Sequence, residues 1–305
     1  MDGHLRVAVH GIHIMRLSLM ALGAVLLASA SPASAASAPL TIVAAENVYG
    51  DLAKHVAGSH ATVTSILSNP DQDPHLFEAD PATAKALTNA RIVMANGADY
   101  DPWMEKLLNA SKADNRAEIV VADLVGKKSG DNPHLWYDPA NMKITAEKLA
   151  DALANADPAH KADYDRNANA FVAGLKPLDA MMADMKARYT GQPVTASEPV
   201  FGYMAQALGL DMHNERFQTA VMNGTEPSPA DVAAFEDDLK GHKVKVMLYN
   251  SQADDAAVKR LVGIAKASHV PVVGVSETEP AGKSYEVWML EQLNALNQAL
   301  AKGSS

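Results

Sequence analysis

The segment "PAHKADYDRNANAFVAGLKPLDAMMADMKARY", from Pro158 to Tyr189, decides the fold of this 305-residue chain. Apolar residues recur every three or four positions between Tyr164 and Met185, and no strand pattern interrupts them. This spacing predicts one long α-helix. Pro177 should kink it, because proline removes one backbone hydrogen bond and its ring clashes with the preceding turn. A long helix of this kind is typical of a connector between two lobes.

On both sides of this segment, short apolar strands alternate with helices, and this alternation predicts parallel or mostly parallel sheets. The predicted strands are 40–46, 61–67, 91–97 and 117–123 before the segment, and 192–197, 243–250 and 270–276 after it. The predicted fold class is therefore α/β, with two α/β lobes, each with a mostly parallel sheet, joined by one long connecting α-helix. We place the N-terminal lobe at 36–157, the connecting helix at 158–189 and the C-terminal lobe at 190–305.

The first 35 residues form a separate feature. The stretch "MRLSLMALGAVLLASASPASA", Met15 to Ala35, has a basic start, an apolar core and a small-x-small end. This pattern predicts a secretory signal peptide, so we expect residues 1–35 to be removed and the protein to reside in the periplasm. The sequence contains no cysteine, which excludes disulfides, thiolate ligands and a lipid on an N-terminal cysteine.

The charge balance narrows the range of partners. The chain has 26 basic and 36 acidic residues and a formal net charge of −10. An acidic balance argues against nucleic acid or an anionic membrane as a partner. It leaves metal cations and small solutes open.

Two histidines occur in the same local setting. His75 lies in "DPHLFEADP" and His134 lies in "NPHLWYDP". In both, a proline precedes the histidine, a leucine and an aromatic residue follow it, and an Asp-Pro pair typical of a helix start comes next. Both follow predicted strands, at the carboxyl ends where open α/β sheets bind ligands. A lone histidine is more often structural than a ligand, but the repetition makes these two the candidate metal ligands.

Acidic residues occupy the matching places in the second lobe. Glu198 follows a predicted strand and precedes a proline at a helix start, where it could instead complement the helix dipole. Glu277 follows the strand 270–276 directly, and Glu279 is its competitor two residues on. We favour Glu277 because Glu279 lies in the loop beyond the strand. Glu226, which a helix follows, fits a capping or supporting acid better than a ligand.

The chain resembles the metal-binding solute receptors of bacterial ABC importers, solute-binding protein family 9, from about residue 40 to 300. "DPHLFEADP" resembles the P-H-x-[YF]-E-P segment of this family, and "NPHLWYDP" resembles its D-P-H-x-W-x-D-P segment. "SEPVFGYMAQALGL" resembles its H-x-x-F-x-Y-x-x-x-x-x-G-L segment, and "TEPS" resembles its E-P-S. The resemblance implies two lobes joined by one long helix. It also implies four metal ligands: His75, His134, Glu198 and Glu277.

This chain departs from many zinc-binding members of that family. Those have histidine at the third ligand position and a histidine-rich loop before the second ligand, whereas this chain has Glu198 and "GKKSGDN". Two imidazoles and two carboxylates form a harder ligand set than three imidazoles and one carboxylate. We therefore expect one divalent transition-metal ion as the cargo, with Mn²⁺ favoured, Zn²⁺ next and Fe²⁺ still open.

The resemblance implies a high-affinity metal receptor that delivers its ion to an ABC permease in the inner membrane. We expect a monomer that is not an enzyme. The alternative is a secreted metal-dependent hydrolase with a His₂-carboxylate site, which would need an open coordination position and a base. No H-E-x-x-H or G-x-S-x-G motif is present to supply one. A surface adhesin would need an anchor or lipidation site, and neither is expected.

Overall fold

The N-terminal lobe is built on a sheet of four parallel strands in the order β2-β1-β3-β4. The structure is a computed structural model that describes residues 1, 4, 8, 39–69, 77–111, 113–252 and 256–302. The strands are β1 (Leu40–Glu46), β2 (Ala61–Leu67), β3 (Ile92–Ala95) and β4 (Ala117–Val120). All of β3 is buried, as expected for a parallel strand covered on both faces. The predicted signal peptide lies outside the described residues, except for positions 1, 4 and 8.

Helices cover this sheet, and two of them begin at the Asp-Pro pairs that follow the candidate histidines. Asp80 accepts a hydrogen bond from the backbone N of Thr83 (2.8 Å) at the start of α2, and Asp138 accepts one from Ala140 (2.9 Å) at the start of α5. The elements are α1 (Asn47–Ala57), η1 (Gly58–His60), α2 (Pro81–Leu87), α3 (Pro102–Ala110), α4 (Val121–Leu124), η3 (Leu135–Tyr137) and α5 (Pro139–Ala156).

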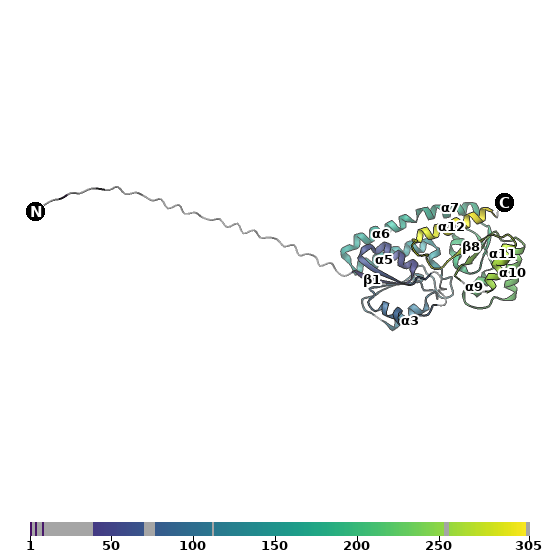
Figure 1. Ribbon diagram of the computed structural model, residues 1–305, viewed down its shortest axis with the longest axis horizontal. Coiled ribbons are helices and arrows are strands. Elements are labelled where there is room, and N and C mark those ends of the chain that lie inside the picture. The colour runs from purple at the N-terminus through teal and green to yellow at the C-terminus, as the bar shows by residue number, and fades with distance from the viewer. Residues whose placement is uncertain are drawn as a thin grey trace. The chain divides into compact units, whose positions relative to one another are not determined.

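The connecting segment is helical almost throughout but is divided in two. After η4 (Pro158–His160), helix α6 (Lys161–Gly174) ends just before Leu175 and α7 (Lys176–Tyr189) begins just after it. Pro177 occupies the first turn of α7, where its missing N–H and fixed φ are tolerated. The interruption therefore occurs where the proline was expected to kink the helix. Figure 1 shows α6 and α7 in succession along one side of both sheets.

The C-terminal lobe repeats the arrangement, with four parallel strands in the order β6-β5-β7-β8. Two of its elements, β6 and α9, were not predicted from the sequence. The elements are β5 (Pro193–Ala196), η5 (Pro199–Phe201), α8 (Gly202–Ala207), β6 (Asp211–His213), α9 (Glu215–Met222), α10 (Pro229–Lys240), β7 (Met247–Asn250), α11 (Ala256–Ala267), β8 (Val272–Val275) and α12 (Tyr285–Lys302).

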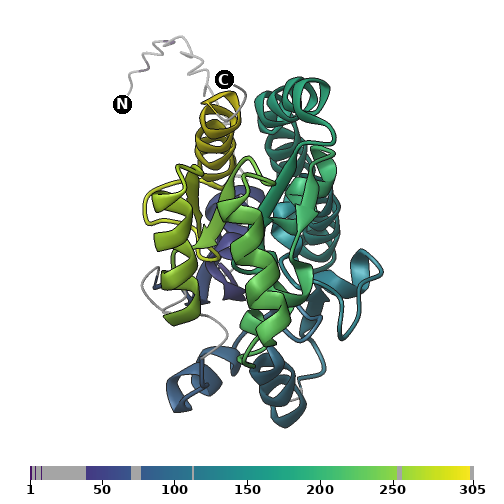
Figure 2. The ribbon, with the colours of Figure 1, turned by 90° about the vertical axis from the view of Figure 1, so that its right-hand side faces the viewer.

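One hydrophobic core, which we call the central core, runs through both lobes. It joins the inner face of the first sheet, for example Ile42, to that of the second, for example Leu248, through residues of α5, α6, α7 and α12. Figure 2 shows α12 and α7 next to each other, and the two helices pack together. A smaller core lies on the other face of each sheet. The two lobes therefore share their largest apolar contact.

Candidate metal centre

The three predicted ligands that the structure describes lie near the carboxyl ends of strands from both sheets. Glu198 follows β5, Glu277 follows β8, and Asn250 is the last residue of β7. In the other lobe, His134 directly precedes η3. The loop that carries His134 is hydrogen-bonded to the end of β3, because the Asn96 side chain donates to the carbonyl of Pro133 (2.8 Å). Parallel strands end at one edge of their sheet, so each sheet delivers its polar side chains to the same region.

His134 is fully buried and its ring is held in one orientation by Asn132. The Asn132 Oδ1 atom lies 3.1 Å from the backbone N and 2.7 Å from the Nδ1 of His134. The Asn132 amide NH₂ donates to the carbonyl of Pro199 (2.7 Å), which leaves Oδ1 as the acceptor. The imidazole hydrogen is therefore on Nδ1, and the lone pair of the neutral ring is on Nε2.

That Nε2 atom faces a carboxylate oxygen. It lies 3.1 Å from Glu277 Oε2, and both side chains are fully buried. With the hydrogen on Nδ1, two lone pairs point at each other, and only a cation between them, a proton or a metal ion, makes the contact favourable. Two ligands of one ion, each at about 2.0–2.2 Å, lie roughly 3 Å apart. The pair is spaced for a shared metal ion.

Glu277 is held at both carboxylate oxygens and at its backbone. Tyr100 donates its hydroxyl hydrogen to Oε2 (3.0 Å), and Asn250 Nδ2 donates to Oε1 (2.6 Å). Burial and the negative charge of Glu277 raise the pKa of Tyr100 well above its usual value, so the hydroxyl keeps its proton. The backbone N of Glu277 donates to Gln252 Oε1 (2.6 Å). These contacts leave the carboxylate little freedom to turn.

Glu198 joins the same cluster through Asn250. Its side chain is 5% exposed, and its Oε2 atom accepts a hydrogen bond from Asn250 Nδ2 (2.9 Å). The same amide nitrogen thus contacts both carboxylates. The structure therefore brings three of the four predicted ligands into one buried cluster: His134, Glu277 and, through Asn250, Glu198.

Glu279, the competitor of Glu277, faces a different part of the protein. Its backbone N donates to Asn47 Oδ1 (3.1 Å), and its carbonyl accepts from Asn47 Nδ2 (2.7 Å). The side chain lines a cavity together with Asp51 and Lys54. Burial, with a smaller contribution from Asp51, raises the pKa of Glu279 to about 9. Of the two acids, Glu277 is the one that contacts His134.

His75 lies in the segment 70–76, outside the described residues. Among the residues that the structure does describe, no three His, Cys, Asp or Glu side chains form a group that could hold a metal ion by themselves. The full set of four ligands therefore stays a prediction, and it depends on a residue that the structure does not place.

The sequence did not single out the residues that orient the cluster, namely Tyr100, Asn132, Asn250 and Gln252. Asn250 and Gln252 stand at the end of a predicted strand, as "NSQ", and this position was the available signal. Tyr100 and Asn132 had no comparable signal, because their roles come from contacts with residues far away in the chain.

A pair of buried acids shapes the loop that carries Tyr100. Asp101 accepts hydrogen bonds from the backbone N atoms of Asn96 (2.7 Å) and Gly97 (2.8 Å). Glu46, at the end of β1, is 4% exposed. Burial raises the pKa of both acids, and the negative charge of Asp101 raises that of Glu46 further. The loop is thus fixed by the two backbone hydrogen bonds that Asp101 accepts.

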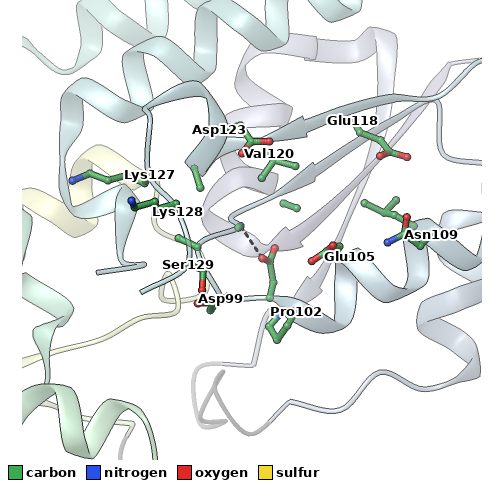
Figure 3. A pocket seen from close by; sticks show the side chains of 16 residues that line it. Asp99, Pro102, Glu105, Asn109, Glu118, Val120, Asp123, Lys127, Lys128 and Ser129 are labelled. Atoms are coloured by element: carbon green, nitrogen blue, oxygen red, sulfur yellow. Dashed lines mark hydrogen bonds between the residues drawn. The ribbon is translucent and has the colours of Figure 1, made fainter. Parts of the chain in front are cut away.

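A cavity of about 480 Å³ lies elsewhere in the N-terminal lobe, along β4 and α3. Figure 3 shows Lys127 and Lys128 at one end of it and Glu118 and Asn109 at the other. None of the predicted ligands that the structure describes lines this cavity. Its walls carry charges of both signs, and it is distinct from the cluster of His134, Glu198 and Glu277.

Similarity to known proteins extends over most of the chain. Residues 42–299 match the family model "Zinc-uptake complex component A periplasmic". A metal ABC transporter substrate-binding lipoprotein of Streptococcus cristatus is 26% identical over 287 residues, 87% of this chain and 90% of that protein. A manganese ABC transporter substrate-binding lipoprotein of Streptococcus gordonii is 26% identical over 296 residues, 89% of this chain and 92% of that protein.

The fold is also found among solved structures. The periplasmic zinc-binding protein TroA of Treponema pallidum superposes with a TM-score of 0.74 at 19% identity, over 86% of this chain and 99% of that chain. In the described part of the present chain, no helix is both long enough and apolar enough to span a membrane. The alternative of a secreted hydrolase finds no support in these comparisons. The family match spans most of the chain, so this protein belongs to the zinc-uptake complex component A family: it is a metal-binding substrate-binding protein of an ABC importer and not an enzyme.

Proposed function

We propose that this protein is a periplasmic receptor that captures one divalent ion, Mn²⁺ before Zn²⁺, and delivers it as a monomer to an inner-membrane ABC permease. The four ligands are His75, His134, Glu198 and Glu277. Residues 1–35 are the signal peptide, 36–157 and 190–305 the two lobes, and 158–189 the connecting segment. The metal-import family to which the chain belongs supports this function.

The contact between His134 and Glu277 is the observation that carries the proposal. The two atoms that face each other, Nε2 and Oε2, are 3.1 Å apart and belong to fully buried side chains from different lobes. Burying a carboxylate costs several kcal/mol unless a cation compensates it. A metal ion bound between these atoms compensates the charge and at the same time joins the lobes.

Release of the ion can use protons. Histidine and carboxylate ligands must be deprotonated to bind a metal ion, so protonation of His134 and its acidic partners competes with the metal. Because the ligands come from both lobes, any change in the lobe contact made by the permease also strains the site. Both routes weaken metal binding without a chemical reaction.

The ligand set supports manganese as the cargo. Two of the four ligands are carboxylates, and carboxylate oxygen suits Mn²⁺ better than additional imidazole does. The relative in Streptococcus gordonii is named for manganese, whereas TroA is named for zinc. Intrinsic affinity rises from Mn²⁺ towards Zn²⁺ at almost any such site. Zinc is therefore expected to bind well in vitro whichever ion the cell loads.

Metal titration of single variants tests the proposal. His134→Ala removes a ligand and should lower the affinity for Mn²⁺ and Zn²⁺ by more than the 10–100-fold typical of groups that only orient ligands. His242→Asn is the matched control, because His242 is exposed at a positive φ of 53°, which asparagine tolerates. Unchanged affinity of His134→Ala, with an intact fold, would contradict the ligand assignment.

The metal content of protein purified from its own periplasm identifies the transported ion. Manganese at close to one equivalent, and rescue of a transporter mutant by manganese, are the expected results. Zinc at close to one equivalent, with rescue by zinc alone, would overturn the order of the two ions but not the receptor function.

A further inference from the structure

The side chain of Asn250 lies between the two carboxylates and has only one possible orientation. Asn250 is 1% exposed, and its Nδ2 atom donates to Glu198 Oε2 (2.9 Å) and to Glu277 Oε1 (2.6 Å). Its Oδ1 atom accepts a hydrogen bond from the backbone N of Gln252 (3.0 Å). A flipped amide would place Oδ1 against two carboxylate oxygens and lose the Gln252 bond, so the orientation is fixed.

The backbone of Asn250 is equally restrained. Its N–H donates to Ser197 Oγ (2.9 Å), and Ser197 is the residue directly before Glu198. The amide is therefore anchored to β7 and to the loop after β5 at once. The two hydrogens of its NH₂ group are both used, one on each carboxylate.

This arrangement makes the two oxygens of Glu277 different. Oε1 is bound to Asn250, while Oε2 faces His134 Nε2 at 3.1 Å and accepts from Tyr100. To chelate an ion with both oxygens, the carboxylate would have to turn Oε1 towards the ion and stretch its hydrogen bond to Asn250. A hydrogen bond to an ionised group is stronger than one between neutral groups, so this turn is unfavourable.

We propose that Asn250 is a positioning residue that restricts Glu198 and Glu277 to one metal-binding oxygen each, and that it thereby shifts the relative affinity of the site towards ions of low coordination number. This inference rests on the proposed metal-binding function. With one oxygen from each carboxylate, Glu198 and Glu277 supply two donor atoms and not four, which suits the low coordination number of tetrahedral Zn²⁺. Mn²⁺ favours more oxygen donors, which a two-oxygen carboxylate would provide.

The amide thus acts against the preference that the ligand composition creates. Two carboxylates favour Mn²⁺, and the restraint on their oxygens favours Zn²⁺. The discrimination of the site between the two ions is then the difference between these opposing contributions, and Asn250 controls the second of them.

The test compares the ratio of the Mn²⁺ and Zn²⁺ dissociation constants in the wild type, in Asn250→Ala and in Gln252→Ala, by competition with a fluorescent chelator. Asn250→Ala should weaken zinc binding more than manganese binding, so the ratio should fall at least about tenfold, or 1.4 kcal/mol. Gln252→Ala is the control, because the Oε1 atom of Gln252 accepts hydrogen bonds from the backbone N atoms of Glu277 and Thr278, whereas Asn250 binds the carboxylate oxygens themselves. It should lower both affinities and leave the ratio within about threefold of the wild type.

X-ray absorption of the manganese-loaded wild type is a second test, which measures the metal coordination directly and does not need a folded variant. Each carboxylate should contribute one oxygen to the nearest shell of ligands. Two outcomes would overturn the inference: an unchanged ratio in Asn250→Ala, or two-oxygen chelation by both carboxylates in the wild type. A wild-type protein that binds neither ion would instead refute the metal-binding function itself.

Discussion

Substitution of Asn132 by alanine should weaken metal binding while the protein stays folded. Asn132 Oδ1 is the acceptor for His134 Nδ1 (2.7 Å), and this bond keeps the lone pair of the ring on Nε2, towards Glu277. Groups that orient a metal-binding histidine in this way typically contribute 10–100-fold to affinity, which equals about 1.4–2.7 kcal/mol. The lost bond to the Pro199 carbonyl should cost a further ~0.5–1.5 kcal/mol of folding stability.

Two companion variants separate the hydrogen bond from the bulk of the side chain. Asn132→Asp retains an acceptor for Nδ1 and adds negative charge, so it should recover most of the affinity that alanine loses. Gly202→Ala removes no polar group, but its new Cβ would lie 2.7 Å from Asn132 Nδ2 and would push the amide away from Pro199. It should therefore lower the affinity in the same direction as Asn132→Ala, by a smaller factor.

Isothermal titration with zinc in the presence of a competing chelator, at pH 7.5, measures all three variants against the wild type. Thermal unfolding of the metal-free proteins checks that each variant is folded. If folded Asn132→Ala and Gly202→Ala both bind zinc within twofold of the wild type, the orientation of His134 by Asn132 is not what prepares the site.

Three further predictions concern the scaffold. Hydrogen bonding to Asp51 raises the pKa of His55 from 6.5 to about 9. The stabilisation from this contact is therefore fully present below pH ~6.5 and is lost as the pH rises through 9. His55→Gln should lower the melting temperature at pH 6 but not near pH 10. Asn47→Ala removes both hydrogen bonds to the backbone of Glu279, which join the two lobes. We therefore expect the free energy of unfolding, measured by chemical denaturation, to fall by about 1–3 kcal/mol. An unchanged free energy would show that this contact is dispensable. Because the central core joins the lobes, metal-free and loaded protein should differ little in radius of gyration by X-ray scattering, and a large difference would contradict a shared core.

The regular parts of the fold could be predicted because their patterns are local. The strands 40–46 and 61–67 have the predicted bounds, and both Asp-Pro pairs begin helices. The elements that were missed are short or polar. β6 has only three residues, Asp211–His213, which is too few to show an alternation, and Asn214 in a left-handed conformation (φ 62°) separates it from α9.

The candidate site was predictable only in part, for a related reason. Position at the end of a parallel strand identified His134, Glu198 and Glu277 as candidates. Their partners could not be found in this way, because the contact between His134 and Glu277 joins residues 143 positions apart. The role of Asn250 depends on both carboxylates arriving at one amide nitrogen, and only the assembled sheet of the C-terminal lobe creates that arrangement.

The central core depends on α12, the last helix that the structure describes. Six large, buried side chains of α12 belong to this core: Tyr285, Trp288, Met289, Leu293, Leu296 and Leu300. Until α12 has been synthesised and has docked, the inner faces of both sheets remain in contact with water, which is unfavourable for so much apolar surface. Glu277 lies only a short loop before α12, so this helix also anchors the segment that contacts His134. A chain truncated before α12 would therefore leave a large part of the central core exposed to water, and it should not fold.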